Sequence, residues 1–385
     1  MINVEHELVR HTDYLRAALQ QDRRPLGLFL GAGAPMAVRP SGSPIIPDIA
    51  GLTDAVRTDV TGAAKAVVDA AFAQLDASAG PPANIENLLD YLRRLSAIPG
   101  TDPIRGFSHA DLADADAEVC KVVRSRLDVH LPAAGTPYHS VALWARAAVR
   151  HAPLELFTTN YDLLMEQALE AAEVPYFDGF AGSFRPLFDV HAVEEDELPD
   201  RWVRLWKLHG SINWAMDSAG AVVRCASMDP GDRTLIYPSH LKYDESRRLP
   251  YLALLDRLRT FLRQPSAVLV TCGFSFRDAH INEVVGQALR TNQTAAVQAL
   301  LHGELSNYTE ATAIATLTPN LSVLAKDGAV IGTHRGDWSG GGMGATTLDL
   351  GDFGAFGDLL LDLVGIGATS SAPGSTGATS ATSTP

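Results

Sequence analysis

The residues best suited to chemistry are an amide and a carboxylate that follow one apolar run of the chain. Residues 154–166 read LELFTTNYDLLME, so an apolar run stops at two threonines before Asn160 and Asp162 open an amphipathic segment. This order predicts a buried strand, a polar turn and a helix. Ligands of open α/β sheets sit at the carboxyl ends of strands, which makes both side chains site candidates. A plain helix cap explains the same letters, because Asn and Asp are common at helix starts.

His209 is the third candidate. Residues 202–208 alternate like a strand and end at His209-Gly210-Ser211. A histidine in this place is either a structural hydrogen-bond donor or a general base, because its proton exchange falls near neutral pH.

Two glycine turns complete the set. The apolar run 26–30 ends at Gly31-Ala32-Gly33-Ala34, and the apolar run 267–272 ends at GFSFRD, residues 273–278. Glycine turns let the backbone approach a phosphate and point N–H groups at it. A single Gly-x-Gly is a weak signal, which is met in many turns. Residues 41–56, with Asp48 before a helix, are typical of a mobile loop over a site, and equally of a plain surface loop.

The elements around these turns alternate between strands and helices. Helical periodicity covers 3–20, 52–77, 84–97, 110–130, 137–150, 245–264, 278–291 and 353–364. Further short strands are predicted at 220–225, 233–237, 296–302 and 321–331, the last of these as a hairpin, and residues 194–197 as a solvated acidic loop. We therefore predict a Rossmann-like, doubly wound parallel sheet over 24–364, with an N-terminal helix in 1–23 and a helical insertion at about 52–131.

Composition limits the class of protein. The 385 residues are 46% hydrophobic and carry a formal net charge of −14, without a long basic run. This balance argues against general binding of nucleic acid or of anionic membranes. The first twenty residues lack the apolar core of a signal peptide, and no apolar stretch is long enough to span a bilayer, so we expect a cytoplasmic protein. Residues 365–385 are uncharged, rich in Gly, Ser and Thr, and predicted to be disordered.

The cysteines are isolated. Cys120, Cys225 and Cys272 form neither a disulfide framework nor a paired-cysteine zinc motif, and three inert buried thiols are expected. No metal site is predicted.

The four turns GAGA, TTNYD, KLHGS and GFSFRD, in this order, resemble the SIR2 family of sirtuin-like NAD-binding proteins over residues 24–335. They resemble most the SIR2-like domain proteins that act as NADases in bacterial anti-phage defence. The resemblance implies that Gly31, Ala32 and Gly33 cradle the NAD pyrophosphate and that His209 is the catalytic base. It also implies that Asn160 and Asp162 act at the nicotinamide ribose and nicotinamide. Further NAD contacts are implied at Asp48, Thr159, Gly273, Ser275 and Asp278; for Asp48, Asp278 and His280 the structural alternative has equal weight.

Two departures from the family pattern narrow the function. Pro35 stands near the place where the family usually has a serine. Sirtuin deacylases also carry a zinc ribbon of two paired-cysteine motifs after the histidine, and residues 211–260 hold only Cys225. Without that ribbon, water rather than an acyl-lysine is the expected acceptor, and the products are nicotinamide and ADP-ribose.

The chemistry fits these residues. Cleavage of the nicotinamide–ribose bond passes through an oxocarbenium-like transition state, as glycoside hydrolysis does. Asn160 would orient the water or a ribose hydroxyl, His209 would take a proton, and Asp162 would hold the carboxamide or favour the developing positive charge.

The sequence thus predicts an NAD hydrolase. The alternatives are a protein deacylase and a non-catalytic subunit that binds NAD or ADP-ribose. By resemblance we expect a homo-oligomer and, as a partner, a separately encoded ATPase or Argonaute-like protein.

Overall fold

The computed structural model describes residues 4–77, 82–217, 219–225, 233–236, 250–340 and 347–366. A ten-stranded sheet lies at its centre, in the order β1-β15-β14-β13-β12-β11-β2-β3-β7-β4. Its strands are β1 (Val4–Glu7), β2 (Leu26–Leu30), β3 (Leu154–Thr158), β4 (Tyr176–Phe177), β7 (Val203–Lys207), β11 (Val268–Cys272), β12 (Ala296–Leu300), β13 (Leu321–Leu324), β14 (Gly328–Ile331) and β15 (His334–Ser339). The run from β13 to β4 is parallel, and only β14 pairs antiparallel with both of its neighbours.

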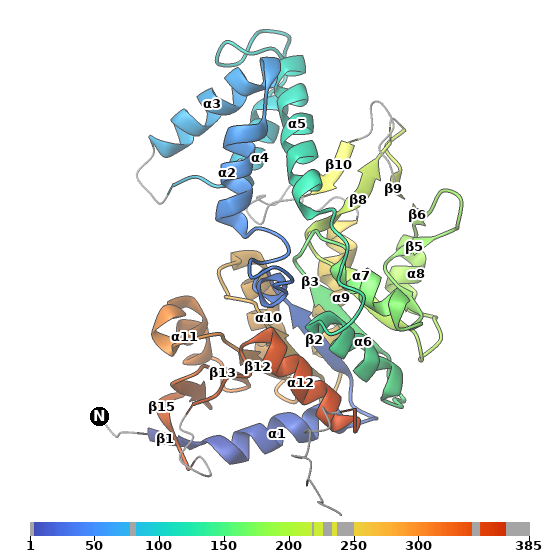
Figure 1. Ribbon diagram of the computed structural model, residues 1–385, viewed down its shortest axis with the longest axis vertical. Helices are drawn as coiled ribbons and strands as arrows, with labels where there is room; N and C mark the ends of the chain where they lie inside the picture. The colour runs from blue at the N-terminus through green and yellow to red at the C-terminus, as the bar shows by residue number, and fades with distance from the viewer. Residues whose placement is uncertain are drawn as a thin grey trace, which may run out of the picture.

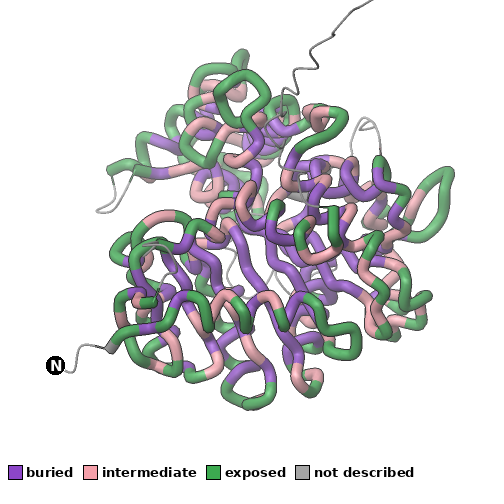
Figure 2. Tube along the Cα trace, turned by 60° about the horizontal axis from the view of Figure 1, so that its bottom comes forward, coloured by how far each residue is buried: buried purple, intermediate pink, exposed green. Residues whose placement is uncertain are grey.

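The two faces of the sheet bury separate cores, because the central strands are buried at every position. Leu28 and Leu30 of β2 belong to one core, and Phe29 between them belongs to the other. The first core includes residues of α1 (Leu8–Gln20), α6 (Pro137–Ala147), α7 (Leu164–Ala171) and α12 (Phe353–Leu363). The second includes residues of α9 (Tyr251–Arg263), α10 (Ala279–Thr291) and α11 (Thr309–Ala315). Helices on both faces of a mainly parallel sheet confirm the predicted Rossmann-like, doubly wound class. Figure 2 shows the buried strands running through the middle of the molecule.

Four helices form a lobe beside the sheet. They are α2 (Ile49–Asp59), α3 (Gly62–Asp76), α4 (Ile85–Ser96) and α5 (His109–Leu127), and they stand together at the top of Figure 1. Helix α4 begins at a capping box between Asn84 and Asn87, and Ser108 caps α5. Inside the lobe Nε of Arg93 lies 2.7 Å from Oδ1 of Asp116, and both side chains are largely buried.

A second, five-stranded sheet adjoins the carboxyl end of β7, in the order β10-β8-β9-β6-β5. Its strands are β5 (Phe180–Ala181), β6 (Leu187–Phe188), β8 (Gly210–Met216), β9 (Val222–Arg224) and β10 (Arg233–Ile236), with α8 (Val190–Glu195) beside them. Among the described residues no group of three His, Cys, Asp or Glu side chains could hold a metal ion. Within the same ranges no helix is long and apolar enough to cross a membrane.

Several predicted elements differ from the structure. The segment 3–20 is not one helix, because residues 4–7 form an edge strand that pairs in parallel with β15. The segment 52–77 is two helices, broken at Gly62, whose φ of +66° is unfavourable for other residues. The strand β8 was not predicted. Most of the predicted tail (367–385) and the start of the predicted helix 245–264 (245–249) lie outside the described residues.

The acidic stretch 194–197 is not a solvated loop throughout. Glu194 and Glu195 end helix α8, and Asp196 turns inward. Nε of Arg204 lies 2.6 Å and an amino group of Arg257 2.7 Å from the two carboxylate oxygens of Asp196. Both arginines are almost fully buried, so this carboxylate neutralises charge inside the fold.

Candidate functional site

The four turns singled out in the sequence meet at one edge of the sheet. The last residues of β11, β2, β3 and β7 are in register, since Cys272 pairs with Leu30, Leu30 with Thr158, and Thr158 with Lys207. The turns that follow these strands are therefore neighbours. Ligands bind at this edge in open α/β sheets, above all where the chain reverses its winding direction, which here is between β2 and β11.

The two glycine turns pack backbone against backbone at this reversal. The N–H of Gly31 donates to Cys272 O at 3.0 Å, and the N–H of Gly33 donates to Gly273 O at 2.9 Å. Gly273 has a φ of +70°, and a Cβ there would lie 2.5 Å from Ala34 N. Of the amides at positions 31–34, only that of Ala32 has no hydrogen-bond partner within the described part of the chain. The Ala32 amide is thus the one free to bind a ligand.

Gly31→Ala should destabilise the fold. Its Cβ would lie 2.4 Å from Gly273 O and 2.6 Å from the Cα of Phe274, which are backbone atoms that cannot rotate away. We expect the free energy of unfolding to fall by about 1–3 kcal/mol. Urea denaturation measures this loss. Gly286→Ala is the matched control, because Gly286 lies inside α10 with only an arginine side chain nearby, and alanine there should be neutral or stabilising. Equal stability of Gly31→Ala and the wild type would contradict the packing described.

A cavity of about 460 Å³ opens beside the paired glycine turns. Its size is that of small-molecule sites. Three of its walls are the first turn with the short 3₁₀ helix η1 (Ala34–Ala37), the β11 turn, and the start of α12. It is lined by Ala32, Gly33, Met36, Ala37, Arg39, Gly273, Phe274, Ser275, Leu300, Leu301, His302, Tyr308, Gly351, Asp352 and Phe353. Of the residues predicted to bind a cofactor, Ala32, Gly33, Gly273 and Ser275 line this cavity.

Several lining residues were missed in the sequence. Arg39 brings a guanidinium to the cavity, and its Nε donates to Met36 O at 2.9 Å. His302 and Tyr308 follow β12, whose last residue is in register with Cys272 of β11. The sequence signal was present, because the apolar run 296–301 also ends at a turn with glycine, Gly303. Reading it as a fifth strand end would have found this wall.

Asn160 is held beneath the first glycine turn. Its Nδ2 donates to Gly31 O at 3.1 Å, and its backbone N–H donates to Oγ1 of Thr158 at 3.0 Å. Thr158 in turn donates to Leu30 O at 2.7 Å. These bonds fix the side chain of Asn160 between β2 and β3, and its Oδ1 can accept a hydrogen bond from a ligand hydroxyl or water.

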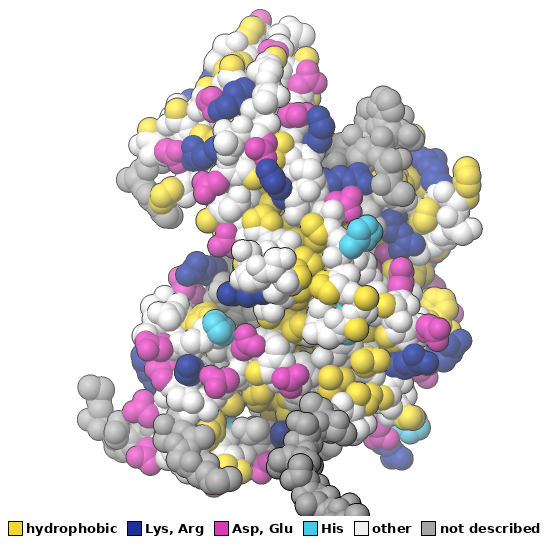
Figure 3. Space-filling model, viewed as in Figure 1, with side chains coloured by type: hydrophobic (Ala, Val, Ile, Leu, Met, Phe, Trp, Pro, Cys, Tyr) yellow, Lys and Arg dark blue, Asp and Glu magenta, His cyan; other side chains and the backbone are white. Residues whose placement is uncertain are grey.

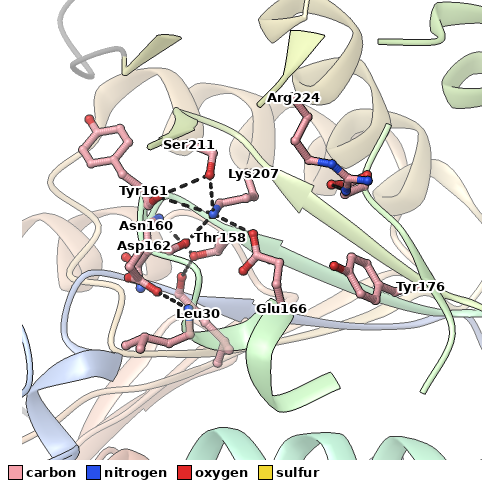
Figure 4. A network of polar contacts seen from close by, with 12 residues as sticks. Leu30, Thr158, Asn160, Tyr161, Asp162, Glu166, Tyr176, Lys207, Ser211 and Arg224 are labelled. Atoms are coloured by element: carbon pink, nitrogen blue, oxygen red, sulfur yellow. Dashed lines mark hydrogen bonds and ion pairs between the residues drawn. The ribbon is translucent and has the colours of Figure 1, made fainter. Parts of the chain in front are cut away.

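A buried lysine, which the sequence reading did not single out, ties the Asn160 turn to the His209 turn. Nζ of Lys207 lies 2.8 Å from Oε1 of Glu166 and 2.8 Å from Oγ of Ser211. It also donates to the backbone carbonyl of Asp162. Figure 4 shows Lys207 at the centre of these contacts, with groups from β7, β8, α7 and the turn after β3 around it. One charge therefore holds both candidate catalytic turns in place.

The carboxyl group of Asp162 is buried close to Lys207. Its Oδ1 accepts the N–H of Leu164 at 3.0 Å, which is the local bond that the helix-cap interpretation expects. Burial raises its pKa to about 6, against the opposing effect of the Lys207 charge. The side chain is 5% exposed.

His209 faces Asp278, a residue that was predicted from the sequence to contact NAD. Nε2 of His209 lies 3.0 Å from Oδ2 of Asp278. Burial lowers the pKa of His209, but Asp278 and the more distant Glu86 outweigh it, so the net shift is upward from the ordinary value of 6.5. The same contact holds the pKa of Asp278 below its usual range, although burial opposes this. The ring of Tyr161 lies 6.4 Å from that of His209.

The remaining predicted residues are placed as follows. Asp48 caps α2 by accepting the N–H of Gly51 at 2.8 Å, on the exposed segment before the helix. Thr159 is half-buried between β3 and Asn160, and His280 is half-buried in the first turn of α10. None of the three lines the cavity of 460 Å³.

The fold is that of a Rossmann-like protein, and its candidate ligand site lies at the carboxyl ends of its parallel strands. Residues 154–316 match the family model described as SIR2-like domain, a span that includes the Asn160, His209 and Gly273 turns. Over these residues the chain is similar to SIR2-like domains. Among curated proteins, no sequence matches it.

Solved structures align along most of the chain, but with low structural similarity. A structure of Sir2 enzymes described for their mechanism and regulation has a TM-score of 0.39 and 11% identity, and the match covers 92% of this chain and 95% of that one. A complex of a Sir2 homolog with NAD has a TM-score of 0.40 and 15% identity, covering 94% and 96%. A cytosolic 5'-nucleotidase bound to cytidine has a TM-score of 0.34 and 10% identity, covering 93% and 90%. The likeness to SIR2-like domains therefore rests on the sequence match over residues 154–316.

Proposed function

We propose that the protein hydrolyses NAD⁺ at the nicotinamide–ribose bond and releases nicotinamide and ADP-ribose. One observation carries the proposal: Asn160 and His209 each follow by two residues the paired strand residues Thr158 and Lys207. Asn160 also bonds to Gly31 O of the first glycine turn, although neither Asn160 nor His209 lines the cavity at the paired turns. A substrate with a phosphate-bearing body and a reactive glycosidic bond needs this combination. The SIR2-like domain match supports NAD as that substrate, as does a free amide at Ala32 beside Arg39.

The proposed reaction needs little from the protein beyond positioning. The bond between the ribose C1′ and the nicotinamide nitrogen breaks, and its electron pair neutralises the positively charged ring. The oxygen of water then bonds to C1′ and loses a proton, which His209 accepts. Oδ1 of Asn160 accepts a hydrogen bond from that water or from a ribose hydroxyl and so orients it. Because nicotinamide leaves as a neutral base, no general acid is required.

Mass spectrometry tests the proposal directly. The purified protein, alone and with the product of a neighbouring gene, is incubated with NAD⁺, and nicotinamide and ADP-ribose are quantified. Equimolar release of both products supports hydrolysis. An acyl-lysine peptide in a parallel reaction separates the deacylase alternative, for which deacylation and O-acyl-ADP-ribose would be found. NAD⁺ that binds but stays intact in every condition would indicate the non-catalytic alternative.

Asn160→Ala should lose NAD⁺ turnover but still bind NAD⁺. The change removes an orienting group that acts in the transition state, so we expect a fall of at least about 100-fold in kcat with little change in affinity. The stability should fall by about 1 kcal/mol, since one hydrogen bond to Gly31 O is lost. Thermal melts, calorimetry and NAD⁺ turnover on the same sample measure all three.

Asp162→Asn is the companion variant. If the carboxylate acts on the nicotinamide end, turnover should be partial and the apparent affinity shifted. If it serves only to accept the Leu164 N–H, asparagine should replace it without loss, because Asn accepts that bond as well. Lowered melts with surviving turnover in both variants would support the cap interpretation and contradict the site.

We further propose that this activity depletes NAD⁺ as an effector of anti-phage defence, in a homo-oligomer and together with an ATPase or Argonaute-like partner. The likeness of the four ordered motifs to that branch of the family supports this assignment. Phage challenge of cells that carry the gene and its neighbour tests it. We expect cellular NAD⁺ to fall on infection, and unchanged NAD⁺ with unchanged phage yield would contradict it.

A further inference from the structure

Asp278 is a buried carboxylate, of which one oxygen caps a helix and the other faces a histidine. Its Oδ1 accepts the N–H groups of His280 and Ile281, at 2.9 and 3.1 Å, and thereby caps helix α10. Its Oδ2 lies 3.0 Å from Nε2 of His209. The side chain is 8% exposed, and it does not line the cavity beside the glycine turns. A carboxylate placed in this way holds a neighbouring group rather than a ligand.

We propose that Asp278 is a positioning residue for His209, which keeps the proton of the neutral imidazole on Nε2 so that Nδ1 is the proton acceptor. This inference rests on the proposed function for its catalytic meaning, but the dyad itself is a property of the folded protein. Nδ1 has no hydrogen-bond partner among the described residues, whereas Nε2 lies 3.0 Å from Oδ2 of Asp278, a buried oxygen that no other described residue contacts through a hydrogen bond. A carboxylate is acceptor-only when ionised, so the nitrogen that faces it must carry a proton.

The geometry also explains why this aspartate is rigid. The same carboxylate that orients the histidine satisfies two free N–H groups at the start of α10, so the helix fixes its rotamer. The β11 turn that leads into α10 therefore has two tasks. Its first half, at Gly273 and Ser275, lines the cavity, and its end, at Asp278, orients the base on the neighbouring turn.

Three charged or titratable groups surround the imidazole of His209. Asp278 comes from α10, Glu86 from the first turn of α4 in the helical lobe, and Tyr161 from the turn after β3. Both carboxylates raise the pKa of His209 and burial lowers it. Loss of the Asp278 charge should therefore move the pKa downward, and the acid limb of any activity that depends on neutral His209 should move to lower pH.

Nitrogen NMR of the full-length protein tests the tautomer without reference to activity. The ring nitrogens of His209 are assigned by their absence in His209→Gln. We expect a protonated Nε2 and an unprotonated Nδ1 in the wild type. In Asp278→Asn the helix cap is kept, but the amide NH₂ can face Nε2 as a donor, so the proton should move to Nδ1 and the pKa of His209 should fall. A wild-type proton on Nδ1, or an unchanged tautomer and pKa in Asp278→Asn, overturns the proposal.

Turnover then gives the size of the effect. An Asp-to-Asn change in a comparable Asp–His pair costs about 10⁴ in kcat through the wrong tautomer, and we expect a loss of that order here, in kcat rather than KM. Asp278→Ser, which caps the helix but does not reach the imidazole, is the second variant if Asp278→Asn does not fold. Asp189→Asn is the matched control, since Asp189 caps α8 in the same way and should leave turnover unchanged. If NMR shows the predicted tautomers and the wild-type protein does not turn over NAD⁺, the dyad stands and the proposed function fails.

Discussion

His209→Ala is expected to abolish NAD⁺ turnover. A positioned general base contributes about 10²–10⁴ in rate, and alanine leaves nothing that accepts the proton. NAD⁺ binding, measured by calorimetry, should persist, because the residues that line the cavity of 460 Å³ belong to other turns. In the wild type, kcat/KM should fall as pH drops through a midpoint above 6.5, since Asp278 and Glu86 raise the pKa of His209 above that value despite burial.

The control for this variant is His191→Ala. His191 lies on α8 with 87% of its side chain exposed, so its loss should change neither turnover nor the pH profile. Removal of His209 also leaves Asp278 without its ionic partner in a buried place, so the melting temperature of His209→Ala should be compared before turnover is interpreted. A folded His209→Ala protein with wild-type turnover would make His209 a structural strand-end residue.

Lys207→Met should cause the largest loss of stability. The side chain is 1% exposed, and its charge faces Glu166, Ser211 and the carbonyl of Asp162. Removing one partner of a buried ion pair leaves the other charge unpaired, which costs about 3–5 kcal/mol. The pKa of Asp162, which Lys207 lowers, should rise further from its value of about 6. Chemical denaturation measures the first effect, and turnover should fall because both catalytic turns lose their common anchor.

The double variant Lys207→Met with Glu166→Leu tests the cause. An apolar pair of similar volume should recover most of the lost stability, because no unpaired charge remains. Lys65→Met is the surface control: Lys65 pairs with Asp69 along α3, both exposed, and such a pair contributes less than about 1 kcal/mol. A double variant that is less stable than Lys207→Met alone would show that the ion pair is not what the lysine supplies.

The sequence predicted the central sheet well because its strands are buried on both faces. Runs such as 26–30 and 267–272 are almost wholly apolar and are followed by glycine, and both are strands whose carboxyl ends are where they were predicted. The edge of the sheet was harder to predict. Residues 4–7 are polar and continue the helical pattern of 8–20, and they form a strand only because β15 offers them a pairing edge. Nothing local in the sequence encodes that partner.

The candidate site was predictable in its turns but not in its pairings. Asn160 and His209 follow strands, and the register of those strands places them side by side. Lys207 was not singled out in the sequence, because all its polar partners except Ser211 lie 41 to 46 residues away in the chain. For the same reason Asp278 reads as a helix cap, and its contact with His209 is set by tertiary structure alone.

Figure 3 shows apolar side chains gathered between the upper lobe and the rest of the molecule. The cavity of 460 Å³ is also formed by chain segments that lie far apart in the sequence. Helix α12 packs closely on α6, since a Cβ added at Gly357 would lie 3.1 Å from the Cβ of Ser140. Phe353, the first residue of α12, lines the cavity. On the ribosome, 144 residues separate His209 from Phe353. At about 5–20 residues per second, about 7–30 seconds therefore pass between the synthesis of His209 and that of Phe353, which completes the cavity lining. If the proposed function holds, an NAD⁺-consuming chain cannot act on its own cell's NAD⁺ until helix α12 has been made.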